Sequence, residues 1–155
     1  MTLIKLPRAL REAFLLLARV GLGAVFLAHG LQKFVSNGMG ATAEGFAAMG
    51  VPAPALSAWF AALVETVGGA ALILGALTPV FALLLAINMI GALVLVHLPQ
   101  GLWVTDNGYE LVLGLAAGAL ALAAAGAGRF SVDGLLGKRS TDAAEVAREG
   151  VLAGR

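Results

Sequence analysis

Four long apolar stretches alternate with short polar segments along the 155-residue chain, at about residues 13–34, 55–77, 80–98 and 108–128. A helix of about 20 apolar residues crosses the hydrocarbon core of a bilayer. Each stretch is therefore long enough to be one membrane span. The pattern predicts an all-α protein that folds as a four-helix transmembrane bundle.

The polar segment between the first two stretches predicts a short helix at the membrane interface. Residues 42–49 are amphipathic, and Gly50, Pro52 and Pro54 follow them. Glycine suits the left-handed end of a helix, and proline cannot continue one. We therefore expect a short interfacial helix that ends near Gly50, before the second span begins.

These elements divide the chain into an N-terminal segment (1–12), a membrane domain (13–128) and a charged tail (129–155). The basic residues of the N-terminal segment resemble the start of a secretory signal, but the apolar run after them is too long for a signal core. We expect a retained first span. The tail is expected to be partly disordered, with Asp142 and Glu145 capping a short helix.

The basic residues also predict the orientation of the chain in the membrane. Positive side chains collect on the cytoplasmic side of membrane spans, and only Lys33 lies in the two connections that would then be external. The other flanking basic residues precede the first span or follow the fourth: Lys5, Arg8, Arg11, Arg129, Lys138 and Arg139. Both termini are therefore expected in the cytoplasm.

Composition agrees with a membrane protein and excludes several other classes. The chain is 60% hydrophobic and 12% charged, with a mean hydropathy of +0.94, which is too apolar for a soluble domain. A net charge of +1 leaves no basic surface for nucleic acid. The absence of cysteine excludes disulfides, iron–sulfur ligation and thiol chemistry by the chain itself. The sequence also contains no flavin or nucleotide motif.

Ionisable groups inside membrane spans usually face the bundle interior and mark function. Arg19 and Glu65 lie at about 9 and 18 Å from the cytoplasmic ends of their predicted helices, a gap that an extended arginine could nearly cover. They predict an inner polar layer, joined by Asn88, which we interpret as an interhelical hydrogen bond. Arg19 and Glu65 would form either a structural ion pair or a group that handles protons or substrate.

A second, outer layer is predicted at about 24 to 30 Å, where His29, Lys33, His97 and Glu110 reach one level. The histidines could form hydrogen bonds at helix ends, bind a quinone or another small molecule, or less readily ligate haem as a pair. A zinc site with Glu110 as third ligand ranks last, and no metal site is assigned. Lys33 is expected to anchor the interface. Asn88 and His97, nine residues apart, fall on opposite sides of an ideal helix.

Small residues predict the faces on which the helices pack. On the second span Ala61, Ala62, Glu65, Gly68 and Gly69 share one face. On the fourth span the predicted packing residues are Gly114, Gly118, Ala117, Ala121 and Ala125. Such ridges could serve the bundle itself or a homo-oligomer equally well.

Several of these residues, in their order and spacing, resemble the DoxX family of small four-helix membrane proteins over residues 16–133. They are Arg19, His29-Gly30 with Lys33, Gly50-Val51-Pro52, Glu65 with Gly68-Gly69, Leu74-Gly75, His97, Glu110 and the closing segment 126–133. The resemblance implies a bacterial inner-membrane protein. It also implies a membrane subunit of a quinone-linked oxidoreductase, such as a thiosulfate:quinone oxidoreductase or terminal quinol oxidase assembly, or of an oxidative-stress or thiol-homeostasis complex.

The hypothesis from the sequence is therefore a quinone-docking subunit with its site near the outer interface. His29, His97 and Glu110 would supply hydrogen bonds and a group that titrates near neutral pH. Electrons would come from a redox partner protein, so the chain is at most a non-autonomous part of an enzyme. The alternatives are a small-solute carrier or channel lined by Arg19 and Glu65, and a scaffold that recruits soluble enzymes through its tail.

Overall fold

The computed structural model describes residues 6–137, and within this range every regular element is helical. In chain order the elements are α1 (Arg8–Leu31), the π-helix η1 (Gln32–Asn37), α2 (Met39–Ala48), α3 (Pro54–Leu74), α4 (Thr78–Ala92), the π-helix η2 (Leu93–His97), the 3-10 helices η3 (Leu98–Gln100) and η4 (Val104–Asp106), and α5 (Glu110–Ala125). The predicted all-α bundle is confirmed.

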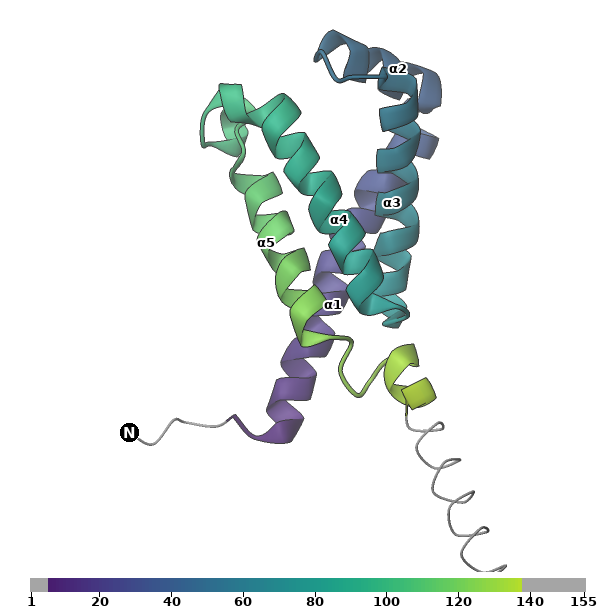
Figure 1. The fold of residues 1–155 in the computed structure, drawn as a ribbon, viewed down its shortest axis with the longest axis vertical. Helices are drawn as coiled ribbons and strands as arrows, with labels where there is room; N and C mark the ends of the chain where they lie inside the picture. Colours follow the sequence, from purple (N-terminus) through teal and green to yellow (C-terminus); the bar gives the residue numbers. More distant parts are fainter. Residues whose placement is uncertain (1–5, 138–155) are drawn as a thin grey trace, which may run out of the picture.

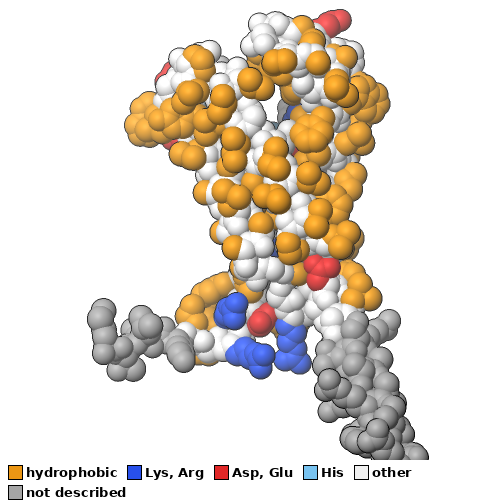
Figure 2. Space-filling model, viewed as in Figure 1, with side chains coloured by type: hydrophobic (Ala, Val, Ile, Leu, Met, Phe, Trp, Pro, Cys, Tyr) orange, Lys and Arg blue, Asp and Glu red, His pale blue; other side chains and the backbone are white. Residues whose placement is uncertain are grey.

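Three of these helical segments are long and apolar enough to cross a membrane: Arg8–Asn37, Pro54–Leu74 and Thr78–Gln100. The fourth, α5, has 16 residues and is about 24 Å long, somewhat less than a typical hydrocarbon core of about 30 Å. It ends earlier than its hydropathy predicts because Gly126, with φ +77°, turns the chain out of the helix. Large apolar side chains cover the outside of the bundle (Figure 2), as a lipid-facing surface requires.

The predicted short helix between the first two spans is present as α2. It begins at Met39, after Gly38 with φ +77° breaks the chain at the end of η1, and Gly50 ends it in the left-handed conformation at φ +73°. α2 packs against α3 at one extremity of the bundle (Figure 1). We call this extremity, which also holds the connection between η2 and α5, the loop end.

Helices α1 and α3 pack with their backbones in near contact. A Cβ atom on Gly23 would lie 2.7 Å from the carbonyl oxygen of Gly69, and one on Gly30 would lie 2.9 Å from Cα of Thr66. Only glycine permits so close an approach. The face of α3 predicted from its small residues is buried as expected, with Glu65 on it.

The second pair, α4 and α5, packs through a different face of α5 than the sequence predicts. The buried residues of α5 are Val112, Ala116, Ala119 and Leu122, which meet Ala82, Leu85, Ala86 and Met89 of α4. The alanines of the predicted ridge do not pack within the bundle: Ala117, Ala121 and Ala125 are exposed, and a Cβ on Gly114 would meet nothing within 4 Å, whereas one on Gly118 would lie 3.5 Å from Leu22 of α1. Larger side chains on the other face bury more apolar area and so decide which side turns inward.

The two helix pairs form a V (Figure 1). α1 with α3 and α4 with α5 converge where both described ends of the chain lie, which we call the terminal end, and they diverge toward the loop end. The space-filling view shows a hollow between the two arms at the loop end (Figure 2). The bundle is therefore closed by contacts at one end and open at the other.

The terminal end is held by charged side chains that bond to backbone groups. The Asp133 carboxylate accepts hydrogen bonds from the N–H groups of Leu77 and Thr78, at 2.8 and 2.9 Å, and so caps the start of α4. Glu12 likewise accepts a bond of 2.6 Å from the N–H of Arg129. Residues 129–137 of the predicted tail are thus folded against the bundle, whereas Asp142 and Glu145 lie outside the described residues.

Candidate functional site

A cavity of about 550 Å³ occupies the space between the two arms toward the loop end. Its volume lies in the range of small-molecule sites, about 300–1,000 Å³. α1, α2, α3, α4 and α5 all contribute to its lining, which is mostly apolar. The polar side chains among the lining residues are His29, Lys33, Ser57, Glu65, Asn88, His97 and Asn107.

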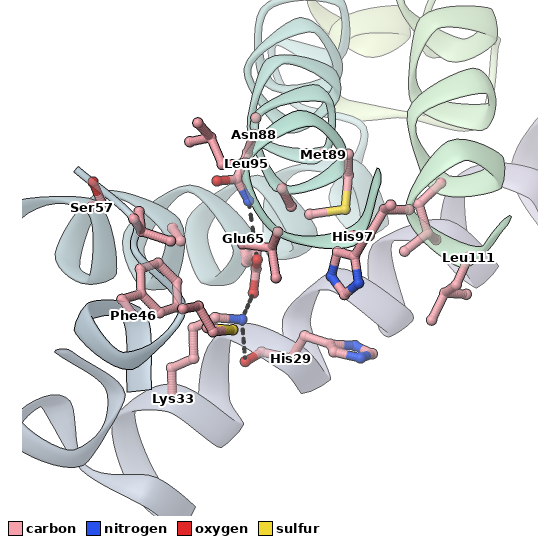
Figure 3. Close-up of a pocket in the computed structure, with 18 of the residues that line it drawn as sticks. His29, Lys33, Phe46, Ser57, Glu65, Asn88, Met89, Leu95, His97 and Leu111 are labelled. Carbon is pink, nitrogen blue, oxygen red and sulfur yellow. Dashed lines mark hydrogen bonds and ion pairs between the residues drawn. The ribbon is translucent and has the colours of Figure 1, made fainter. Parts of the chain in front are cut away.

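A polar network from three helical elements lies on one wall of this cavity (Figure 3). Lys33 in η1 forms an ion pair with Oε2 of Glu65 on α3, and Nδ2 of Asn88 on α4 donates to Oε1 of the same carboxylate at 3.0 Å. Both oxygens of Glu65 therefore have partners, which offsets the cost of burying its charge. Glu65 lies about 17 Å along α3 from Pro54, near the middle of the membrane.

The ion pair of Arg19 with Glu65, one of the two alternatives for these residues, is not formed. Arg19 is buried at the terminal end, where its Nη2 donates to the carbonyl oxygen of Phe130 at 2.7 Å. The reason is the register of α1 on α3: the contacts of Gly23 and Gly30 set Lys33 beside Glu65 and leave Arg19 level with the end of α3. Lys33 is accordingly the ion-pair partner of Glu65 rather than an interface anchor.

Both predicted histidines line the cavity, one on each arm (Figure 3). Nδ1 of His29 lies 2.9 Å from the carbonyl oxygen of Val25, and Nδ1 of His97 lies 2.6 Å from that of Asn107. A carbonyl oxygen only accepts, so each Nδ1 carries the hydrogen. The expected helix-end hydrogen bonds are thus present, and they leave Nε2 of each ring available to a ligand.

Two π-helical segments, which the sequence pattern did not reveal, place residues of the site. η2 lies between Asn88 and His97, and η1 contains Lys33. A π-helical turn, with i→i+5 hydrogen bonds, is wider than an α-helical turn, so each residue rotates by a smaller angle around the helix axis. This brings His97 closer to the side of the helix that carries Asn88. Both side chains therefore line the same cavity although an ideal helix would separate them.

Glu110 does not join the other members of the predicted outer layer. It is absent from the cavity lining, and its Oε1 accepts a hydrogen bond of 2.8 Å from the N–H of Val104 in the neighbouring loop. Among residues 6–137 no group of three or more His, Cys, Asp or Glu side chains is placed to share a metal ion. The zinc alternative therefore lacks its third ligand in the described part of the chain.

The cavity has a partly exposed apolar lining and a continuation toward the loop end. Phe60 on α3 and Ile87 on α4 line it, and 44% and 52% of their surfaces are exposed. A second hollow of about 470 Å³, which Gln100 also lines, continues toward the loop end. The two hollows share Met49, Val96, His97 and Asn107.

Comparison with known proteins gives one family and two relatives. The DoxX family model matches residues 14–98, which include His29, Lys33, Glu65, Asn88 and His97. The uncharacterized membrane protein Rv3486 of Mycobacterium tuberculosis is 35% identical over 133 residues, 79% of this chain and 81% of that protein. The protein named "Putative oxidoreductase CatD" of Bacillus subtilis is 37% identical over 83 residues, 54% of this chain and 59% of its own length. No solved structure matches the chain.

Proposed function

The chain belongs to the DoxX family of membrane proteins, and on that premise we propose that it docks the head group of a quinone or quinol as the membrane subunit of an oxidoreductase. One observation carries the proposal. Ionisable and amide side chains from α1, η1, α3, α4 and η2 converge on one mostly apolar cavity, whose lining includes the partly exposed Phe60 and Ile87. Polar groups at this depth are costly and usually functional.

The chemistry of the cavity suits such a ligand. An aromatic head group needs an apolar wall, hydrogen-bond partners for two oxygens and a group that exchanges protons. Phe60 and Ile87 supply apolar surface, while His29 and His97 supply imidazole nitrogens that can take part in hydrogen bonds and proton exchange. In this proposal the isoprenoid tail leaves the cavity between α3 and α4, past Phe60 and Ile87, and lies in the bilayer.

The electrons would come from a partner. The sequence contains no cysteine and no flavin or nucleotide motif, so the chain is a docking subunit and a redox protein supplies the electrons. One relative is named as an oxidoreductase, which supports this role. We place the protein in the bacterial inner membrane with both termini in the cytoplasm, in an oxidoreductase, oxidative-stress or thiol-homeostasis complex.

Binding of a short-tailed ubiquinone to the purified protein in lipid nanodiscs tests the proposal. We expect saturable binding, measured by calorimetry, that weakens at least tenfold in the double variant Lys33→Met/Glu65→Gln, because the contacts that hold Lys33 and Asn88 in place on the cavity wall are lost while no lone charge remains. The control is Glu44→Gln, which changes an exposed carboxylate of α2 outside the cavity. Equal affinity of the double variant and the control would remove the proposal.

A small-solute carrier is the second candidate, favoured by the continuation of the cavity to the loop end. Below the cavity, however, the bundle is filled by Phe26, Leu72 and Leu85, which are almost fully buried, and Arg19 bonds to Phe130 beyond them. The cavity is therefore closed toward the terminal end. Solute flux into liposomes that depends on Glu65 would favour the carrier. A Soret band in the spectrum of the pure protein would indicate bound haem instead of a quinone.

A further inference from the structure

Two side chains on the cavity wall, Lys33 and Asn88, donate hydrogen bonds to a protein acceptor. Lys33 Nζ bonds to the Glu65 carboxylate and lies 3.4 Å from the carbonyl oxygen of His29. Asn88 directs Nδ2 to the other carboxylate oxygen, which leaves its Oδ1 as an acceptor. Lys33 and Asn88 thus each direct a donor toward Glu65.

The two imidazoles add acceptors to the same cavity. His29 and His97 each use Nδ1–H to donate to a carbonyl oxygen, of Val25 and Asn107 respectively. In a neutral ring the remaining nitrogen, Nε2, carries a lone pair and no hydrogen. Both rings lie to the same side of the Lys33–Glu65–Asn88 network (Figure 3), so a ligand between the arms meets two nitrogen acceptors.

We propose that the cavity selects the reduced, hydroquinone form of its ligand over the oxidised quinone, with Nε2 of His29 and Nε2 of His97 accepting hydrogen bonds from the ligand hydroxyls. The inference rests on the proposed function and specifies the redox state that the site binds. Hydroquinone hydroxyls donate, whereas quinone carbonyls only accept. Acceptors that face each other in an apolar cavity remain unpaired, which costs affinity.

The size of the preference for hydroquinone follows from the number of hydrogen bonds that only this form can donate to the imidazoles. One hydrogen bond that a buried site makes with one ligand form and not with the other changes the affinity about tenfold. Two imidazoles therefore predict that hydroquinone binds about a hundredfold more tightly than quinone. Tighter binding of the reduced form raises the midpoint potential of the bound couple, by about 60 mV for a hundredfold preference in a two-electron couple.

The test compares three compounds with one ring: a short-tailed ubiquinone, its hydroquinone, and the dimethyl ether of that hydroquinone, which has no hydroxyl hydrogen. Affinities are measured in nanodiscs at neutral pH, with dithionite keeping the hydroquinone reduced; the chain has no disulfide for it to break. We expect the hydroquinone to bind about a hundredfold more tightly than either of the other two. The ether separates hydroxyl donation from ring shape.

Ring-sized substitutions identify the acceptors. His29→Phe and His97→Phe keep an aromatic ring but remove Nε2, and each is expected to lower the ratio of hydroquinone to quinone affinity about tenfold. Glu110→Gln is the control because Glu110 lies outside the cavity lining, and it should leave the ratio unchanged. A structural role for the histidines would weaken both ligand forms together and leave the ratio as it is.

The outcomes separate this inference from the proposed function. Equal affinities for the two forms, or tighter binding of the quinone, overturn the preference for hydroquinone while the cavity remains a quinone site. A ratio that both histidine variants leave unchanged overturns the assignment of the acceptors. If none of the three compounds binds, the proposed function fails and the inference falls with it.

Discussion

The two ends of the bundle use charged side chains in opposite ways. At the terminal end Arg19, Glu12 and Asp133 each bond to backbone groups of another segment. At the loop end Lys33 and Glu65 bond to each other beside a cavity of about 550 Å³. The charged side chains at the terminal end hold segments of the fold together. Those at the loop end line a cavity that a ligand can enter.

The difference teaches that an ionisable residue in a membrane helix is not by itself a sign of a binding site. Arg19 is more deeply buried than Lys33, yet it serves the attachment of residues 129–137. What distinguishes the two residues is the adjoining space, and that depends on where the helix pairs separate. Perturbing one end at a time should therefore separate stability from ligand binding.

The largest effect is expected for Glu65→Gln, which leaves Lys33 unpaired near the middle of the membrane. Removing one partner of a buried ion pair costs about 3 kcal/mol of unfolding free energy. Lys33→Met/Glu65→Gln should recover most of this loss, because it leaves no lone charge. Unfolding in mixed micelles measures both, with Glu44→Gln as the exposed control. A single variant as stable as that control would show that the pair is not buried.

Gly23→Ala should come next, at about 2 kcal/mol, because its Cβ would lie 2.7 Å from the carbonyl oxygen of Gly69 and push α1 from α3. Gly21→Ala is the matched control on the same helix, since a Cβ there meets nothing within 4 Å. It should be neutral or stabilising by about 0.5 kcal/mol. The melting temperatures of the two variants, measured by thermal unfolding, test this prediction. Equal melting temperatures would contradict the close approach of α1 and α3.

Asp133→Ala removes the cap of α4 at the terminal end and should lower stability by about 1 kcal/mol. Ubiquinone affinity should stay within twofold of wild type, because the cavity lies at the other end. Asp106→Ala, in the loop connecting η2 and α5, controls for loss of a carboxylate. A large loss of affinity in Asp133→Ala would mean that the two ends are coupled, contrary to the comparison.

The smallest effect is expected for Glu110→Gln. The glutamine oxygen can still accept the bond from the N–H of Val104, so stability should change by about 0.5 kcal/mol or less. Ubiquinone affinity, measured by calorimetry, should change less than twofold because Glu110 does not line the cavity. A tenfold loss of ubiquinone affinity would show that Glu110 takes part in binding, as the sequence predicted.

Much of the fold could be predicted because it depends on local properties of the chain. Hydrophobic length predicts the spans, the glycine and proline positions near Gly50 predict the end of α2, and small residues predict the buried face of α3. The face of α5 was missed, because small residues alone do not determine which side buries more apolar area. The family resemblance is confirmed by the match over residues 14–98.

The sequence predicted seven polar residues in two layers, and five of them line the cavity: His29, Lys33, Glu65, Asn88 and His97. Arg19 and Glu110 do not line it, and the partner of Glu65 is Lys33 rather than Arg19. Heights counted along straight α-helices cannot include the register set by glycine contacts between helices, nor the π-helical turns of η1 and η2. The register arises from packing between segments far apart in the sequence.

The most direct test of the central claim is the accessibility of single cysteines at two positions of α4. The chain contains no cysteine, so each probe is observed without background. Ala92 lines the cavity, whereas Ala82 is fully buried in the core between α4 and α5. In nanodiscs, a charged methanethiosulfonate should modify Ala92→Cys, with protection by ubiquinone, and leave Ala82→Cys unmodified. Equal modification of both cysteines, or of neither, would contradict a bundle that is open to ligand at one end only.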